Sequence, residues 1–373
     1  MIVAQIVVFA LGVVLAVYVL QSAVRTVVLP RGARSWLGRV VFGGVAASFD
    51  VFAARTKAYE TEDRIRAFVA PVGLLANVAA WLVLMLSAFM LMFWAVDPDA
   101  GWGGAFHLSG SSITTLGFAP ADSTIEQVLA FTVAGFGLLL LTLLITYLPS
   151  IYGAFSRRER KVGLLEVRAG APPNALEFLL RYHRIGWLDR LDEEWQQWEE
   201  WFAEIEESHT TYPALAFFRS PDPHRSWVTA GGAVLDTASL YASTLETPTN
   251  APAGVCIRAG YIALRRIAEF FGIPFDPDPS SDGPISISRD EYDEVYEALV
   301  AEGLSVRQDQ EEAWRDFVGW RVNYDTVLLS LAEMVHAPYA PWTNDRSPPD
   351  HHEHKAKWFW PSPLRGSTRQ RRS

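Results

Sequence analysis

The sequence has little of what a disulfide-linked, thiolate-metal or nucleic-acid-binding protein needs. It contains one cysteine among 373 residues, Cys256, so neither a disulfide nor a thiolate metal site can form within the chain. Lys and Arg are absent from residues 67–156. The formal net charge of −10 argues against nucleic acid as a partner.

The first 156 residues are far more apolar than the rest of the chain. Three stretches are long enough to cross a bilayer as helices, which takes about 20 apolar residues. They cover residues 1–24, 67–96 and 127–156. A fourth stretch, 36–54, contains Arg39 and Asp50, which are costly at the centre of a bilayer. We interpret it as an interfacial amphipathic helix, with a fourth membrane span as the alternative.

Basic residues flank these stretches unevenly. Eight Lys and Arg residues lie between positions 25 and 66, and four more lie between 157 and 161. Cytoplasmic loops of membrane proteins carry the excess of positive charge. The sequence therefore predicts a multi-pass protein of the cell membrane with three spans, an outside N-terminus and a cytoplasmic C-terminal half. The run 157–161 is interpreted as a topology anchor at the lipid headgroups.

The external segment between the last two spans is short and half apolar. A glycine-rich loop at 101–104 leads into small, weakly apolar residues, and Pro120 closes the stretch. This pattern is typical of a re-entrant loop, which needs protein or water around its backbone. Four acids, unopposed by any Lys or Arg, are expected to concentrate cations at its mouth. They are Asp97, Asp99, Asp122 and Glu126.

Residues Ser109–Ala119 read Ser-Gly-Ser-Ser-Ile-Thr-Thr-Leu-Gly-Phe-Ala. The stretch resembles the pore helix and selectivity filter of prokaryotic-type potassium channels and related pore-loop cation channels, whose filter is TVGYG. The matching positions are Thr114, Thr115, Leu116, Gly117 and Phe118. The resemblance covers about residues 67–156. It implies an outer helix, a pore loop and an inner helix.

These residue types suit a cation filter on physical grounds. Rings of backbone carbonyls from four chains replace the hydration shell of a monovalent cation such as potassium. Gly117 permits the backbone angles that such a ring needs. The Thr115 hydroxyl can add an oxygen at the inner mouth, and Phe118 is expected to pack outward. A plain turn between two membrane helices is the alternative.

Two positions depart from the family. Ala119 stands where the family has a glycine that favours positive φ, and forcing alanine there costs about 1–2 kcal/mol. Pro120 stands where an aspartate is usual. We therefore expect the outermost ion site to be reshaped or absent. In the inner helix, Gly135 and Gly137 are either a gating hinge or close-packing sites.

The C-terminal half is predicted to be helical. Its expected features are a buried Trp stripe at 195–202, a capping box of Ser288 with Glu291, and one long helix over 310–336. The expected domains are an N-terminal helix with a basic segment, a pore domain, a cytoplasmic helical domain and a Pro-rich, disordered tail. They cover residues 1–66, 67–156, 157–337 and 338–373.

Two hypotheses for function follow from this all-α membrane architecture. The first is a homotetrameric potassium channel that is gated or assembled by its cytoplasmic domain, through a ligand that the sequence does not identify. Its only cofactors would be potassium ions in the filter. The second is a membrane-tethered sensor or enzyme whose helices only anchor it. The sequence has no P-loop, no dinucleotide-binding motif and no nucleophile–base pair, so we expect no enzyme.

The charge distribution predicts opposite locations for the two ends of the chain. A tag before Met1 is expected to be reached by a membrane-impermeant label on intact cells, and a tag after Ser373 only after permeabilisation. Labelling both tags from the same side would contradict the three-span topology.

Overall fold

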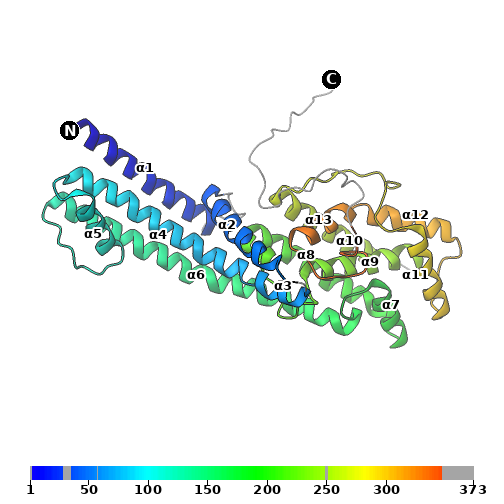
Figure 1. The fold of residues 1–373 in the computed structure, drawn as a ribbon. Coiled ribbons are helices and arrows are strands. Elements are labelled where there is room, and N and C mark those ends of the chain that lie inside the picture. Colours follow the sequence, from blue (N-terminus) through cyan, green and yellow to red (C-terminus); the bar gives the residue numbers. More distant parts are fainter. Residues whose placement is uncertain (1, 28–34, 57, 248–250, 347–373) are drawn as a thin grey trace, which may run out of the picture. The chain divides into compact units, whose positions relative to one another are not determined.

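The computed structural model describes residues 2–27, 35–56, 58–247 and 251–346 (Figure 1). Within these ranges the only β-structure is one antiparallel bridge between Leu245 and Val306. The first six helices are α1 (Ile2–Val27), α2 (Trp36–Ala53), α3 (Tyr59–Arg66), α4 (Val69–Val96), α5 (Gly101–Ile113) and α6 (Thr124–Ala169). They are followed by α7 (Ala175–Arg184), η1 (Leu188–Arg190), α8 (Leu191–Thr211), η2 (Pro213–Phe217), α9 (Trp227–Thr244), α10 (Ala251–Phe271), α11 (Arg289–Ala301), α12 (Gln310–Arg321) and α13 (Asp325–Met334).

The chain divides into two compact units. The N-terminal unit comprises Met1–Phe155 and Thr211–Phe218, and the C-terminal unit comprises Ser156–Thr210 and Arg219–Ser373. The first division lies one residue from the boundary expected at 156/157. The return of residues 211–218 to the N-terminal unit was not predicted from the sequence.

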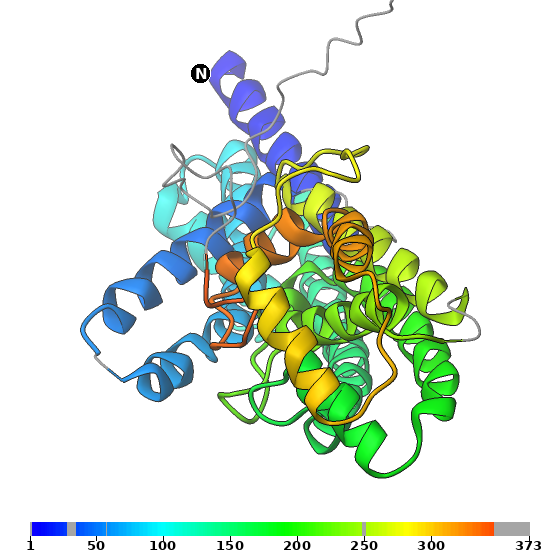
Figure 2. The same cartoon turned by 90° about the vertical axis from the view of Figure 1, so that its right-hand side faces the viewer.

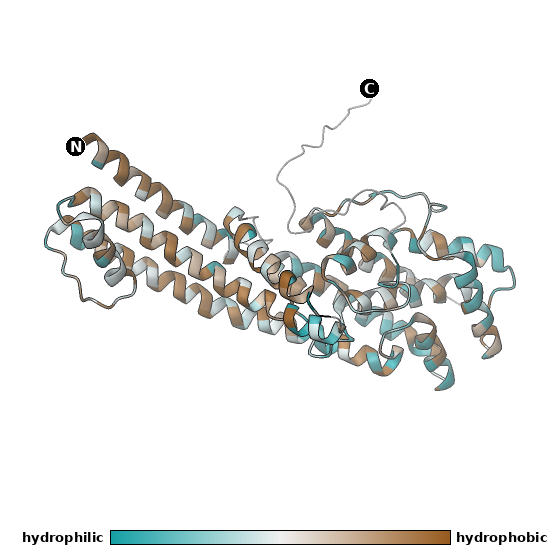
Figure 3. Ribbon diagram, viewed as in Figure 1, coloured by the Kyte–Doolittle hydropathy of each residue, from teal (hydrophilic) through white to brown (hydrophobic). Residues whose placement is uncertain are grey.

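Four helices of the described residues are long and apolar enough to span a membrane. Apolar residues dominate α1, α4 and the first half of α6, whereas the C-terminal helices are mixed (Figure 3). Many large apolar side chains of the N-terminal unit are exposed, among them Ile2, Val14, Val83 and Phe131. Such a surface suits lipid, so the chain is an all-α membrane protein.

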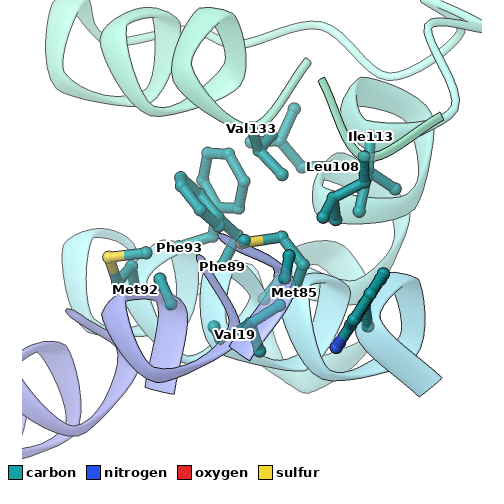
Figure 4. Close-up of a cluster of buried hydrophobic side chains, with 14 of the residues drawn as sticks. Val19, Met85, Phe89, Met92, Phe93, Leu108, Ile113 and Val133 are labelled. Carbon is teal, nitrogen blue, oxygen red and sulfur yellow. The ribbon is translucent and has the colours of Figure 1, made fainter. Parts of the chain in front are cut away.

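Helices α1 and α4 pack closely through small residues. A Cβ atom on Gly12 would lie 2.6 Å from the carbonyl oxygen of Ala88. Ten residues further along α1, Ser22 accepts a hydrogen bond of 3.1 Å from the indole of Trp81, which precedes Ala88 on α4. The two helices are therefore antiparallel. Their shared core includes Val19, Met85, Phe89, Met92, Phe93, Leu108, Ile113 and Val133 (Figure 4).

Helix α2 continues in the direction of α1. Gly38 lies beside Asn77, and Phe42 lies beside Gly73, one turn nearer the start of α4. Both α1 and α2 are thus antiparallel to α4, and they contact successive parts of it. If α2 were a separate membrane span after α1, it would run in the direction opposite to α1. By length and composition α2 qualifies as a span. The topology of three spans with α2 at the membrane interface stays a prediction. The shared direction of α1 and α2 favours it.

The C-terminal unit is built around α9, every residue of which is buried (Figures 1 and 2). The Trp stripe of α8 lies in this core as predicted, since Trp195, Trp198 and Trp201 are at most 1% exposed. The capping box of Ser288 and Glu291 at the start of α11 is confirmed.

The predicted long helix over 310–336 is wrong, because the chain breaks between Arg321 and Asp325. The guanidinium of Arg321 is fully buried and bonds to Asp236 of α9, to Asp325, and to the carbonyl oxygen of Trp342 at 2.7 Å. A buried cation needs such partners, and here they come from α9, from the start of α13 and from the chain after α13.

Two further expectations need correction. The disordered tail does not begin at 338, because Ala340 and Trp342 are buried and Arg346 pairs with Glu291. Residues 347–373, the rest of that tail, lie outside the described residues. Arg158 of the basic run is not a headgroup anchor: it is 2% exposed and bonds to Glu159 and His209 within the C-terminal unit.

The close approach of α1 and α4 predicts opposite effects for two Gly→Ala substitutions. Gly12→Ala should lower the thermal unfolding midpoint in detergent, since overpacking costs about 1–3 kcal/mol. Gly44→Ala, at an exposed helical position with no atom near its Cβ, should leave the midpoint unchanged or raise it. Tryptophan fluorescence follows both transitions. Equal midpoints for the two variants would contradict the packing.

Candidate pore loop

Helix α5 enters the N-terminal unit between α4 and α6. The hydroxyl of Ser109 donates to the carbonyl oxygen of Leu86 at 2.8 Å, ten residues before α4 ends. The carbonyl oxygen of Ile113, the last residue of α5, lies against Gly137, thirteen residues after α6 begins. At 1.5 Å per residue, α5 ends about 15–20 Å along its neighbours. The C-terminus of α5 therefore lies deeper along α4 and α6 than its N-terminus.

The turn after α5 has the hydrogen bonds of a Schellman cap. The N–H of Thr115 donates to Ser112 at 3.0 Å, and the N–H of Leu116 donates to Ser111 at 2.9 Å. Thr115 takes the left-handed conformation of this cap, with φ of 56°. Glycine is usual at this position, and a residue with a Cβ costs about 1–2 kcal/mol there. The strain of the loop therefore lies at Thr115.

The filter-like string leaves its carbonyl oxygens unbonded. Gly117 also has positive φ, 71°, and its N–H shares the Ser111 carbonyl with Leu116. Among the described residues, no N–H or O–H donates to the carbonyl oxygens of residues 114–119. Residues 114–118 are exposed and Ala119 is half-buried. A row of free carbonyls thus begins where α5 ends.

The strain expected at Ala119 is absent. Its φ is outside the left-handed region, and its N–H donates to the hydroxyl of Ser111 at 3.1 Å. The left-handed turn occurs four residues earlier, at Thr115, so the chain has already reversed when it passes Ser111. Phe118 does not pack outward into a core either. Its side chain is 63% exposed in the single chain, and its ring lies 6.4 Å from that of His107 in an edge-to-face arrangement.

The four acids of the external segment have different surroundings. Glu126 is buried, and its carboxylate accepts hydrogen bonds from the N–H groups of Asp122 and Ser123 at 3.0 and 2.9 Å. It caps the start of α6 and does not face the mouth. Asp97 is half-buried at the end of α4 and accepts from the N–H of Asp99. The carboxylates of Asp99 and Asp122 remain at the exposed surface.

The two inner-helix glycines also differ. Any side chain on Gly137 would collide with the backbone of Ile113, so this glycine is a close-packing site. A Cβ on Gly135 would meet no atom within 4 Å. Of the pair proposed as a hinge, only Gly135 is free of tertiary contact.

One exposed strip runs along α6 with alternating spacings of three and four residues. Its members are Val128, Phe131, Gly135, Leu138, Thr142, Ile145, Pro149 and Tyr152, all exposed. This spacing is that of a helix–helix seam. The alternating three- and four-residue spacing is present in the sequence. It could not be recognised there, because a membrane helix is apolar on every side and the residues between the strip positions are apolar too.

Comparisons of the chain with protein-family models, with curated proteins and with solved structures find no match. The case for a function therefore depends on the geometry of the loop and on the residues that form it.

The contact between Gly137 and Ile113 predicts unequal effects for two neighbouring substitutions. Gly137→Ala should displace the end of α5 and lower the unfolding midpoint, whereas Gly135→Ala should have a smaller effect, because a Cβ there would meet no atom of its own chain. Thermal unfolding in detergent measures both. A hinge made of the two glycines together would instead give similar effects for both variants.

Proposed function

We propose that the chain is one subunit of a tetrameric pore-loop channel for monovalent cations. The observation that carries the proposal is the row of unbonded carbonyl oxygens after a re-entrant helix. Non-helical backbone is tolerated at membrane depth only where it is buried in protein or lines water. Carbonyl oxygens that line water at that depth are ligands for a dehydrated cation.

The electrostatics of the loop favour a cation. The C-terminus of a helix carries about half a negative charge, and that of α5 ends at the start of the carbonyl row. No Lys or Arg occurs in residues 67–156, and Asp99 and Asp122 are exposed near the outer end. Each of these features lowers the energy of a cation and raises that of an anion.

The proposed tetramer follows from the surfaces that a single chain leaves exposed. A single loop supplies one side of a ring, and a pore of the potassium-channel type needs four. Residues 114–118 and the α6 strip are exposed in the single chain. Symmetric copies would cover the strip and bring four loops to one axis.

Potassium is the favoured ion because Thr114–Phe118 resembles the filter of that channel family. Ala119 and Pro120 depart from the family, so the outermost ion site is where this filter would differ. Gating or assembly is assigned to the C-terminal unit.

A membrane-tethered sensor is the second candidate, and a cavity in the C-terminal unit favours it. The cavity has a volume of about 730 Å³, and Tyr261, Arg307, Trp314 and Trp320 contribute to its wall. The wall also contains Asp282 and Asp316, and Arg307 pairs with Asp316, so the aromatic rings are what favour a planar ligand. Such a ligand could equally be what the proposed channel responds to.

Substitution of Gly117 tests the pore assignment. Gly117→Val should abolish conduction while leaving the tetramer intact in detergent, because valine disfavours the positive φ at this exposed position. Gly103→Val is the matched control, since Gly103 is also exposed but has an ordinary φ. It should conduct like the wild type.

The measurement is current across a planar bilayer under opposed potassium and sodium gradients, with size determined by light scattering. Wild-type protein that forms monomers and carries no current would favour the tethered sensor. Normal currents through Gly117→Val tetramers would refute the filter.

A further inference from the structure

A segment of eight residues, Thr211–Phe218, joins the two units in an unusual way. It belongs to the N-terminal unit, although Thr210 before it and Arg219 after it belong to the C-terminal unit. We call it the docking segment. Its short helix η2 buries Ala214, Leu215 and Ala216, and Leu215 has no exposed surface.

The docking segment contacts three helices of the N-terminal unit. Leu215 shares a buried cluster with Leu74 of α4. Aromatic pairs extend the contact to α2 and α6. The ring centroids are 5.6 Å apart for Phe217 with Phe42, 5.4 Å for Tyr212 with Tyr147, and 5.8 Å for Phe218 with Phe155.

The docking segment holds α6 at its weakest point. Pro149 lies inside α6, where proline removes a backbone donor and its ring crowds the carbonyl one turn earlier. The hydroxyls of Thr142, Thr146 and Ser150 bond back to carbonyls of the preceding turn, which bends helices further. Tyr147 and Ile151, which bracket Pro149, are buried in the same cluster as Leu215.

We propose that the docking segment is the coupling element through which the C-terminal unit sets the bend of α6 at Pro149. The inference rests on the proposed function, because that bend then decides whether the pore is open or closed. Both ends of the docking segment continue into the C-terminal unit. A rearrangement of that unit would therefore displace the docking segment and the buried cluster that contains Leu215, Tyr147 and Ile151. The filter-like residues 114–118 are not part of this cluster. A change at the docking segment should therefore alter gating and leave ion selectivity unchanged.

A double-mutant cycle on one aromatic pair tests the coupling. Phe218→Ala and Phe155→Ala should each change the open–closed ratio of single channels by about three- to tenfold, the size of one aromatic contact. The double variant should change it no more than the larger single effect. Unitary conductance and the potassium–sodium reversal potential should stay at wild-type values.

Tyr339→Ala is the control, since Tyr339 is a 62% exposed aromatic residue of the C-terminal unit. It should leave the open–closed ratio unchanged. Independent, multiplicative effects of Phe218→Ala and Phe155→Ala would overturn the coupling.

Hydrogen exchange provides a readout that does not need current. Phe218→Ala should speed amide exchange in α6 between residues 145 and 155, and Tyr339→Ala should not. Unchanged exchange in Phe218→Ala would overturn the inference even in a conducting channel. Faster exchange in a chain that never conducts would keep the coupling and refute the proposed function.

Discussion

Satisfying backbone polar groups away from water is the constraint on which the N-terminal unit depends. Inside a bilayer each unpaired N–H or C=O costs several kcal/mol, so lipid-facing chain must be helical. Residues 114–119 are not helical, and their carbonyl oxygens are unbonded within the described residues. Such a segment is stable only beside water, ions or other protein. The proposed tetramer and the proposed cation path both answer this one requirement.

Small residues make the close packing around α5 possible. Gly12 lets α1 approach α4, and Gly137 lets α6 receive the end of α5. Ser109 and Ser111 then use their buried hydroxyls to bind α5 to α4 and to the returning chain at Ala119. Close backbone contact and side-chain hydrogen bonds replace the hydrophobic effect, which does not drive association between helices in lipid.

The C-terminal unit solves a different problem, that of a buried charge. Arg321 lies in its core with Asp236 of α9 and Asp325 at the start of α13, and it also donates to the carbonyl oxygen of Trp342. Removing one partner would leave an uncompensated charge in the core. The docking segment, which packs in the other unit, carries no such charge and consists of apolar and aromatic contacts.

Local signals in the sequence were sufficient for the apolar stretches and the capping box of Ser288, because each depends on neighbours within a few residues. Glu126 caps α6 through Ser123, three residues away, so its role was a local signal that the interpretation as a mouth acid missed. The ordinary φ of Ala119 and the burial of Arg158 could not be predicted from the sequence. Each of these two depends on a partner beyond the nearest turn of the chain: the hydroxyl of Ser111 and the ring of His209. Sequence alone therefore decided which segments are apolar enough to span a membrane. Tertiary structure decided which polar groups contact one another, because the distance between groups that are far apart in the sequence is set by where the chain turns back on itself.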